Sequence, residues 1–258
     1  MTPTDYSLLD RPDISVNSFY PRRNWTPTPE AADDQTITVE DGVTLSCRFF
    51  PVGRESPNIL FFYGNGETAA DYDGIAPIYN QAGINFFVAD YRGYGRSGGS
   101  PAFSTMLSDA HQVLEALRRR LEANQYTGQV FVMGRSMGRH PAFELAANPT
   151  DGIGGLIVES GRPSLGQFVH GLEAADAQAL EAAYREKVRS IEIPVLVIHG
   201  ERDTLAPVEQ AISMFESFGS PGKRLLTIPR AGHNDLLHLG LNEYFAAIRD
   251  FVSPSSET

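Results

Sequence analysis

The sequence predicts an α/β protein with a mostly parallel central sheet flanked by helices. One observation is that apolar runs of strand length recur along the chain and are nearly continuous, as strands buried on both faces require. A second is that the stretches between them carry apolar residues at spacings of three and four, which is typical of helices with one buried face. Strands and helices that alternate in this way predict right-handed crossovers between parallel strands.

The size, charge and cysteine content of the chain narrow its class. With 258 residues, 41% of them hydrophobic, it is expected to form one globular domain with a sizeable core. A formal net charge of -11, with no Lys/Arg run that could offset it locally, argues against nucleic acid or an acidic membrane surface as a partner. Cys47 has no second cysteine to pair with, and residues 1–10 lack a basic region followed by an apolar stretch. We therefore expect a cytoplasmic protein, with the oligomeric state left open.

The first expected elements are an arm and a hairpin. Residues 1–35 are rich in proline, asparagine, arginine and aspartate, and they predict an N-terminal arm packed through Tyr20 and Trp25. No chemistry is assigned to this arm. The main domain is expected over 36–258. It opens with Thr-Ile-Thr-Val, a Glu-Asp-Gly turn and an alternating run over 43–50, which together predict an antiparallel hairpin.

The core strands and helices follow in alternation. Apolar runs predict strands at 58–63, 84–89, 129–133, 155–158, 193–199 and 224–228. Spacings of three and four predict helices at 69–81, 103–123, 137–147, 207–218 and 239–251. The segment 161–189 breaks this rhythm and predicts a short helical insertion. Because ligands bind beyond the carboxyl ends of parallel strands, the insertion is placed to form a lid, although a packing layer without ligand contact fits equally well.

A serine framed by glycines follows one of these strands. Gly-Arg-Ser-Met-Gly at 134–138 comes after the apolar run at 129–133 and before a helical stretch. A serine on such a strand-to-helix turn takes up strained backbone angles, and the flanking glycines remove the Cβ atoms that would collide there. The pattern predicts that Ser136 is a nucleophile. An ordinary turn is the alternative, since short Gly/Ser patterns recur by chance.

Two later loops supply a base and an acid in a fixed order. Asp203 follows the strand ending in His199-Gly200, and His233 follows the strand at 224–228. The order Ser136, Asp203, His233 is that of α/β-hydrolase triads, whereas serine hydrolases of other folds use other orders. The alternatives are that Asp203 caps the next helix and that His233 is an exposed loop residue.

Three stretches carry a resemblance to a known family. They are Gly-Arg-Ser-Met-Gly at 134–138, Asp-Tyr-Arg-Gly-Tyr-Gly-Arg-Ser at 90–97 and Ala-Gly-His-Asn-Asp-Leu at 231–236. In these stretches the chain resembles the α/β-hydrolase superfamily and, within it, the Bem46-like serine hydrolases. The resemblance covers most of 58–251. It implies the α/β-hydrolase fold. The N-terminal arm and the insertion at 161–189 fall outside the resemblance, so the N-terminal antiparallel hairpin and the short helical lid insertion are predicted from the sequence pattern.

The remaining part of the predicted site is an oxyanion hole, in which two backbone N–H groups receive the charge of the tetrahedral intermediate. Met137, directly after the serine, is expected to supply one N–H at the start of its helix. The resemblance implies Asn65 as the second donor. The chain departs from the family at Tyr63, where histidine is usual, and at Arg139-His140-Pro141, where small residues are usual.

The sequence therefore predicts a serine hydrolase of carboxylesterase or thioesterase type, acting on a small-molecule acyl substrate. Ser136 is expected to form an acyl-enzyme, with His233 as base and Asp203 as orienting acid. This mechanism calls for no metal or organic cofactor. The acyl chain length and the choice among ester, thioester and amide are left open. The alternative is a non-catalytic protein of the same fold that binds a ligand or a partner.

Overall fold

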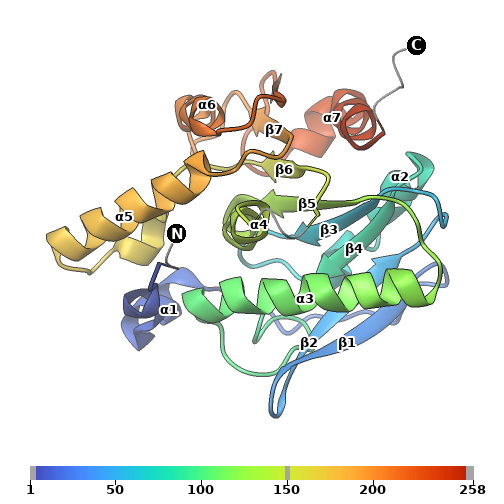
Figure 1. Cartoon of the computed structure of the whole chain (residues 1–258), viewed down its shortest axis with the longest axis horizontal. Helices are drawn as coiled ribbons and strands as arrows, with labels where there is room; N and C mark the ends of the chain where they lie inside the picture. Colours follow the sequence, from blue (N-terminus) through green and yellow to red (C-terminus); the bar gives the residue numbers. More distant parts are fainter. Residues whose placement is uncertain (1–3, 149–151, 254–258) are drawn as a thin grey trace.

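The computed structural model describes residues 4–148 and 152–253, which contain an eight-stranded sheet in the order β1-β2-β4-β3-β5-β6-β7-β8 (Figure 1). The strands are β1 (Asp33–Glu40), β2 (Val43–Phe50), β3 (Asn58–Phe62), β4 (Asn85–Ala89), β5 (Val130–Arg135), β6 (Leu156–Glu159), β7 (Val195–Gly200) and β8 (Lys223–Ile228). The β1–β2 hairpin and the β2–β4 pair are antiparallel, and every other neighbouring pair is parallel. The predicted fold class is thus confirmed.

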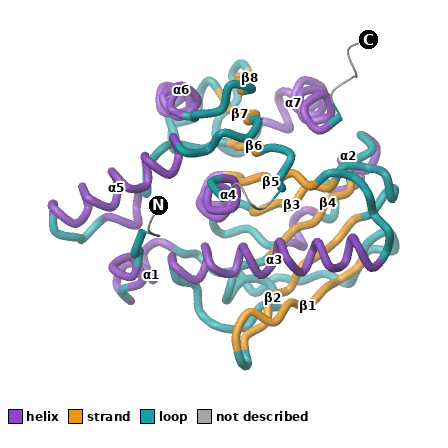
Figure 2. The backbone as a smooth tube through the Cα atoms, viewed as in Figure 1, coloured by secondary structure: helices purple, strands orange, loops and turns teal. Residues whose placement is uncertain are grey.

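Helices cover both faces of this sheet (Figure 2). The described α-helices are α1 (Pro12–Ser18), α2 (Ala76–Gln81), α3 (Phe103–Ala123), α4 (Arg139–Ala146), α5 (Ala174–Arg189), α6 (Val208–Ser217) and α7 (Leu236–Val252). The helices α3, α4 and α6 lie on one face, where the rings of Phe143 and Phe218 are 5.7 Å apart. The helices α2 and α7 lie on the other, where Tyr79 and Phe245 are 4.9 Å apart. Within the described residues, no helix is long and apolar enough to cross a bilayer.

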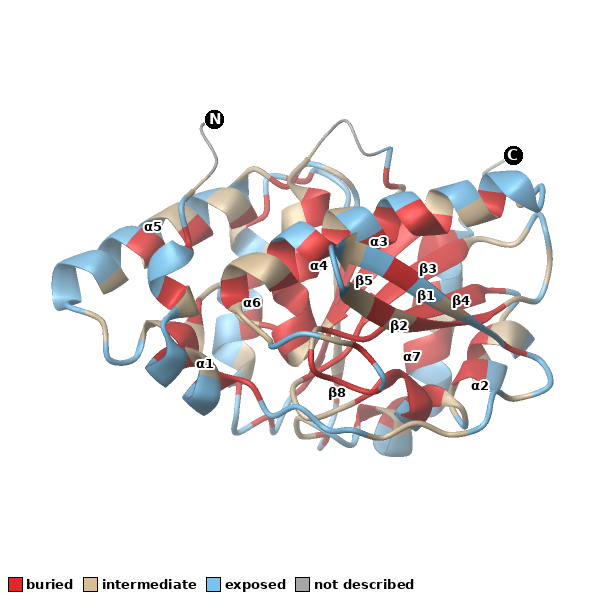
Figure 3. Ribbon diagram, turned by 90° about the horizontal axis from the view of Figure 1, so that it is seen from below, coloured by how far each residue is buried: buried red, intermediate tan, exposed pale blue. Residues whose placement is uncertain are grey.

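The central strands are buried on both faces (Figure 3). Every residue of β3, β4 and β7 is buried, whereas β1 at the sheet edge is largely exposed. Burial on both faces is why the sequence of the central strands is a continuous apolar run instead of an alternating one. The helical layers therefore enclose a core that fixes the strand ends, where the candidate site lies.

The helix predicted at 69–81 is divided in two. A 3-10 turn, η2 (Ala69–Tyr72), comes first, and α2 begins only at Ala76. Gly74 lies between them, and glycine is a poor helix former because its backbone loses the most freedom on ordering. Pro77 lies in the first turn of α2, where its missing N–H costs nothing. Two short helices thus replace the single predicted one.

The last helix begins before the predicted 239–251. It starts at Leu236 and is interrupted at Gly240, whose φ of -145° and ψ of 41° are not helical. A Cβ atom at Gly240 would lie 2.6 Å from Cγ2 of Ile228. The kink thus brings α7 into close contact with the end of β8, and only glycine leaves room for it.

The arm and the insertion contact each other at one end of the molecule, where α1 and α5 lie in Figure 1. The insertion contains a 3-10 turn, η5 (Gly166–Val169), and α5. The rings of Phe19 in the arm and Phe168 in η5 are 5.1 Å apart. Trp25 packs under the guanidinium of Arg48, at 4.5 Å, whereas Tyr20 is 60% exposed and does not anchor the arm by its ring. The division of the chain at residue 35 stays a prediction.

Candidate active site

Ser136 lies on a sharp turn between β5 and α4. The strand ends at Arg135, one 3-10 turn, η3 (Ser136–Gly138), follows, and α4 begins at Arg139. The φ of Ser136 is +50°, a left-handed conformation that costs a non-glycine residue about 1 to 3 kcal/mol. A Cβ atom at Gly138 would lie 1.9 Å from the carbonyl oxygen of Phe62, so α4 approaches the sheet only because glycine stands there. The serine has the strained geometry that its motif predicts.

The structure brings His233 between Ser136 and Asp203. The Nδ1 atom of His233 lies 2.7 Å from Oδ2 of Asp203, and its Nε2 atom lies 2.9 Å from Oγ of Ser136. An ionised carboxylate only accepts hydrogen bonds, so Nδ1 carries the proton and Nε2 is left to accept from the serine hydroxyl. Burial favours a raised pKa for Asp203, but the hydrogen bonds from His233 and from the Ala206 N–H outweigh it and lower the pKa. Asp203 is thus held as an anion beside the imidazole.

Neither alternative for the acid and the base fits these contacts. The N-cap of α6 is Pro207, and no side chain caps that helix. The Oδ1 atom of Asp203 instead accepts the N–H groups of Leu205 and Ala206, each at 2.8 Å, within its own loop. The side chain of His233 is only 11% exposed, so it is not a free loop residue.

His199 is a buried neighbour of Asp203 to which the sequence analysis assigned no role. Its Nε2–H donates to the carbonyl oxygen of Ala206 at 2.7 Å and lies 3.3 Å from Oδ2 of Asp203. Burial lowers the pKa of His199, which favours the neutral ring. The sequence could have indicated that His199 lies near the site, because it stands at the end of β7, four residues before Asp203.

The two expected oxyanion donors line the same cavity as Ser136 and His233. This cavity, of about 420 Å³, is bounded by the backbone turn at Met137 on one side and by Asn65 on the other. The loop of Asn65 is fastened by Glu67, whose Oε2 accepts the N–H of Gly64 at 2.7 Å. Among the described residues, none accepts a hydrogen bond from the N–H of Asn65. That N–H is therefore available to an oxyanion.

The N-terminal arm, to which the sequence analysis assigned no chemistry, fixes the side chain of Asn65. Its Nδ2 donates to the carbonyl oxygen of Ser18 at 2.7 Å. Its Oδ1 accepts the N–H of Tyr20 at 2.9 Å and the hydroxyl of Tyr94 at 2.6 Å. The exposed ring of Tyr20 also lines the cavity. No sequence signal joined the arm to this loop, because the residues in contact are more than 40 positions apart.

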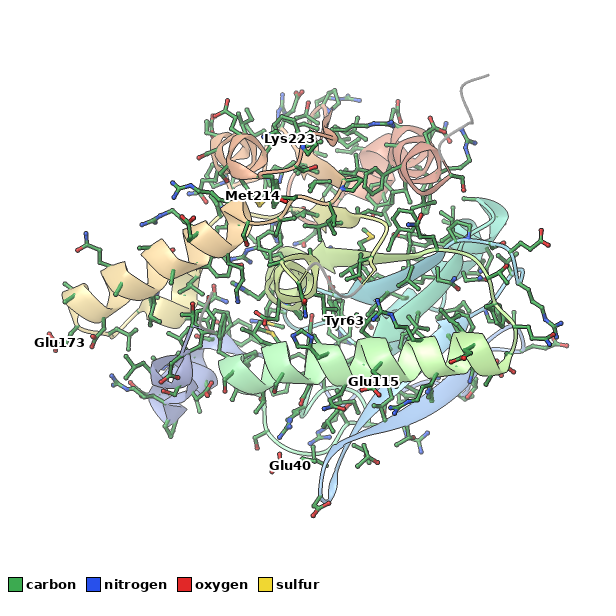
Figure 4. The ribbon with its side chains drawn as sticks, viewed as in Figure 1. Glu40, Tyr63, Glu115, Glu173, Met214 and Lys223 are labelled. Carbon is green, nitrogen blue, oxygen red and sulfur yellow. The ribbon has the colours of Figure 1, made fainter. Side chains whose placement is uncertain are left out.

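Tyr63 stands just before the Asn65 loop, where the family usually has histidine. It has a buried partner in Asp90. Its hydroxyl donates to Oδ1 of Asp90 at 2.7 Å, and its carbonyl oxygen accepts from the hydroxyl of Tyr91 at 2.7 Å. Figure 4 shows Tyr63 near the centre of the molecule. Oδ1 of Asp90 also accepts the N–H of Ala69 at 2.8 Å, whereas Oδ2 has no partner among the described residues. The tyrosine thus hydrogen-bonds one oxygen of a buried carboxyl and still leaves the loop backbone in place.

We expect the Asp90 carboxyl to make stability fall as the pH rises. Burial raises its pKa from 3.8 to about 6, despite the hydrogen bonds from Ala69 and Tyr63. A raised pKa in the folded state gives stability that is complete below pH 3.8 and is lost as the pH passes 6. The free energy of unfolding of the wild type minus that of Asp90→Asn should fall by about 2 kcal/mol between pH 4 and pH 7. Urea unfolding across this range tests it, with exposed Asp250→Asn as the control, and a pH-independent difference for Asp90→Asn would contradict it.

Arg135, the unassigned residue of the serine motif, joins three parts of the site. Its Nε donates to Oε1 of Glu159 at 2.9 Å, and its Nη1 donates to Glu67. Its Nη2 donates to the carbonyl oxygen of His233 at 3.2 Å and to Oδ1 of Asn234 at 2.7 Å. Burial lowers the pKa of Arg135, but the two carboxylates outweigh burial and raise it. The side chain therefore links the Asn65 loop, the end of β6 and the histidine loop.

The sheet order and the left-handed turn after β5 place the chain among the α/β hydrolases. Comparison with known proteins narrows this class. The model of a family described as serine aminopeptidase, S33, matches residues 54–166. Protein bem46 of Schizosaccharomyces pombe is 30% identical over 247 residues, which cover 90% of this chain and 81% of that protein. The chain belongs to the Bem46-like branch of the α/β-hydrolase superfamily.

Two further similarities agree with this placement. Alpha/beta hydrolase domain-containing protein 17B of Homo sapiens is 30% identical over 221 residues, which cover 82% of this chain and 72% of that protein. The Pyrococcus furiosus esterase Pf2001 superposes with a TM-score of 0.70 at 24% identity, covering 90% of this chain and 97% of that one. At that identity the likeness of the solved structure concerns the fold.

Proposed function

We propose that this protein is a serine hydrolase that cleaves carboxylic esters or thioesters through an acyl-enzyme on Ser136. The observation that carries the proposal is the position of the His233 ring, 2.9 Å from the serine oxygen and 2.7 Å from the Asp203 carboxylate. A hydroxyl is a weak nucleophile until a base in hydrogen-bonding reach removes its proton, and this base is oriented by an acid. The description of a structural neighbour as an esterase is consistent with this chemistry.

In the first half-reaction, Oγ of Ser136 attacks the acyl carbon as Nε2 of His233 takes the hydroxyl proton. The charge that develops on the acyl oxygen is received by the backbone N–H groups of Asn65 and Met137. The tetrahedral intermediate then collapses. The bond to the leaving group breaks, and the alcohol or thiol departs with the proton from His233.

In the second half-reaction, water attacks the acyl-enzyme and His233 again takes a proton. The same two N–H groups receive the second oxyanion, and collapse returns the proton to Ser136 and releases the acid. Asp203 stays ionised throughout and stabilises the imidazolium that forms in each half. Every step uses groups of the chain and water.

Ester cleavage is favoured over removal of an N-terminal amino acid by the charges that line the cavity. An aminopeptidase needs a carboxylate to receive the substrate ammonium group. The one carboxylate side chain lining the described cavity is that of Glu67, which is already occupied by Arg135, the N–H of Gly64 and the hydroxyl of Tyr72. The name of the matching family therefore does not fix the substrate of this chain.

A fluorophosphonate probe tests the proposal. Folded protein should be labelled at Ser136 and should turn over 4-nitrophenyl acetate and short acyl thioesters. Ser160 lines the same cavity, but its Oγ donates to the carbonyl oxygen of His233 at 3.3 Å, so this serine has no base and should stay unlabelled. Mass spectrometry locates the label. An unlabelled Ser136 in protein that also turns over neither ester nor thioester would favour the non-catalytic alternative.

A further inference from the structure

Two arginines in the Ser136 cavity have no carboxylate partner. Arg139 and Arg162 both line this cavity. Arg135, which also lines it, is paired with Glu67 and Glu159. Across residues 4–148 and 152–253, by contrast, no carboxylate oxygen lies within 4.0 Å of the guanidinium nitrogens of Arg139 or Arg162. The cavity therefore holds positive charge that the fold does not neutralise locally.

Arg139 is buried beside the nucleophile. Its Nη1 donates to the carbonyl oxygen of Ser136 at 2.7 Å, its Nε donates to that of Arg162 at 2.9 Å, and its Nη2 donates to that of Ser164 at 2.6 Å. A guanidinium has five N–H groups, and the Tyr184 side chain is also hydrogen-bonded to this one, so one N–H group is left for another partner. Burial without a counter-charge lowers the pKa of Arg139 to about 10. A buried cation whose partners are all neutral gains stability when an anion joins it.

Arg162 is half-buried and is held only loosely by the chain. Its one described side-chain acceptor is Oε1 of Gln167, at 3.5 Å from Nη2, the limit of a hydrogen bond. The guanidinium lies against Gly166, where a Cβ atom would be 2.3 Å from that same nitrogen. The φ of Gly166 is +66°, so the backbone at this position favours glycine. The guanidinium of Arg162 thus has space in the cavity wall but no strong hydrogen bond to the chain.

One acidic side chain acts on Arg139 from a distance without pairing with it. Glu181 of α5 raises the pKa of Arg139 through its charge, but it lies more than 4.0 Å from that guanidinium. Its Oε1 accepts the N–H of Leu165 at 3.0 Å, and its Oε2, which has no hydrogen-bond partner among the described residues, lies 3.9 Å from the guanidinium of Arg185. A structural role, tying the start of the insertion to the serine turn, accounts for the carbonyl contacts of Arg139. It does not account for Arg162, whose side chain has only the weak contact with Gln167 inside the insertion. A net charge of -11 for the whole chain makes this local positive charge more notable.

We propose that Arg162, with Arg139 behind it, binds an anionic group carried by the substrate, so that this enzyme prefers acyl esters that bear a carboxylate or a phosphate. This inference rests on the proposed hydrolysis at Ser136, because it assigns the substrate class of the same cavity. The anion would sit between the two guanidinium groups, replace their missing counter-charge and fix the acyl chain relative to Oγ of Ser136. Arg162 is thereby a specificity-determining residue.

The test compares matched esters. One substrate is the mono-4-nitrophenyl ester of adipic acid, and its neutral counterpart is the 4-nitrophenyl ester of adipamic acid, in which an amide replaces the carboxylate. A third, 4-nitrophenyl 5-phosphonopentanoate, distinguishes phosphate-like groups from carboxylates. The wild type should have a kcat/KM about 10-fold or more higher on an anionic ester than on the neutral one, as charge-assisted hydrogen bonds would give. Arg162→Gln should bring the ratio to about one, whereas Arg119→Gln on the exposed surface of α3 should leave it as in the wild type.

A binding measurement separates this inference from the proposed function. Monomethyl adipate, an anion, and methyl adipamate, its neutral counterpart, are titrated calorimetrically into the Ser136→Ala protein. Binding of the anion alone, abolished by adding Arg162→Gln, supports the anion site even if no ester is hydrolysed. Equal kcat/KM values for the charged and neutral esters in an active wild type would overturn the inference while leaving the hydrolase intact. So would equal binding of the two ligands in the calorimeter, whatever the activity.

Discussion

Ser136→Ala is expected to lower the turnover of an acyl ester by about 10⁴-fold to 10⁶-fold while leaving the fold unchanged. The expected size of the loss follows from the way the three residues act as one unit. Without Oγ, the base at 2.9 Å has no proton to take and no acyl-enzyme can form. The residual rate would come from water held near the two backbone N–H donors.

The measurement is kcat on 4-nitrophenyl butyrate, with circular dichroism and thermal unfolding to show that the variant is folded. Ser108→Ala is the control, because Ser108 is exposed on α3 and its hydroxyl donates only to a carbonyl within that helix. Retention of a tenth or more of the wild-type kcat by Ser136→Ala would refute the proposed acyl-enzyme.

The proximity of Ser136, Asp203 and His233 could be predicted because each residue follows a strand and the three occur in a fixed chain order. Ser136 is marked by its glycines, and Asp203 and His233 by loops that follow apolar runs, so local patterns were sufficient. The parallel sheet then places all three strand ends at one edge. The errors in the helices have local causes that are clear only in three dimensions, such as the contact of Gly240 with Ile228.

The supporting residues could not be predicted, because their partners are distant in the sequence. Arg135 and Glu67 are 68 positions apart, and Tyr20 and Asn65 are 45 apart. From the sequence alone, the arginine in Gly-Arg-Ser-Met-Gly is interpreted as part of a solvent-exposed turn. Its buried contacts with Glu67 and Glu159 become clear only in the structure. In the structure, the same contacts make the N-terminal arm and Arg135 the two supports of the Asn65 loop. The geometry of the proposed oxyanion hole therefore depends on segments that show no catalytic pattern.

Arg135→Met is expected to lower the free energy of unfolding by about 3 to 5 kcal/mol. Glu159 is 5% exposed, and loss of the guanidinium would leave its carboxylate and that of Glu67 without their cation. A buried charge deprived of its partner keeps the full cost of desolvation, which exceeds the net value of the pair itself. Urea unfolding at pH 7 measures the change. Arg119→Met, which breaks an exposed pair with Glu115, should change stability by less than about 1 kcal/mol.

The double variant Arg135→Met/Glu159→Gln distinguishes the charge from the packing. If the uncompensated carboxylate is the cause, removing the charge of Glu159 should restore more than about 1 kcal/mol of the loss. The activity readout differs, because Glu67 would still lack the partner that holds the Asn65 loop. The kcat of the double variant should therefore stay low even where its stability recovers. A kcat that recovers together with stability would show that Arg135 contributes only to folding and does not position the oxyanion donors.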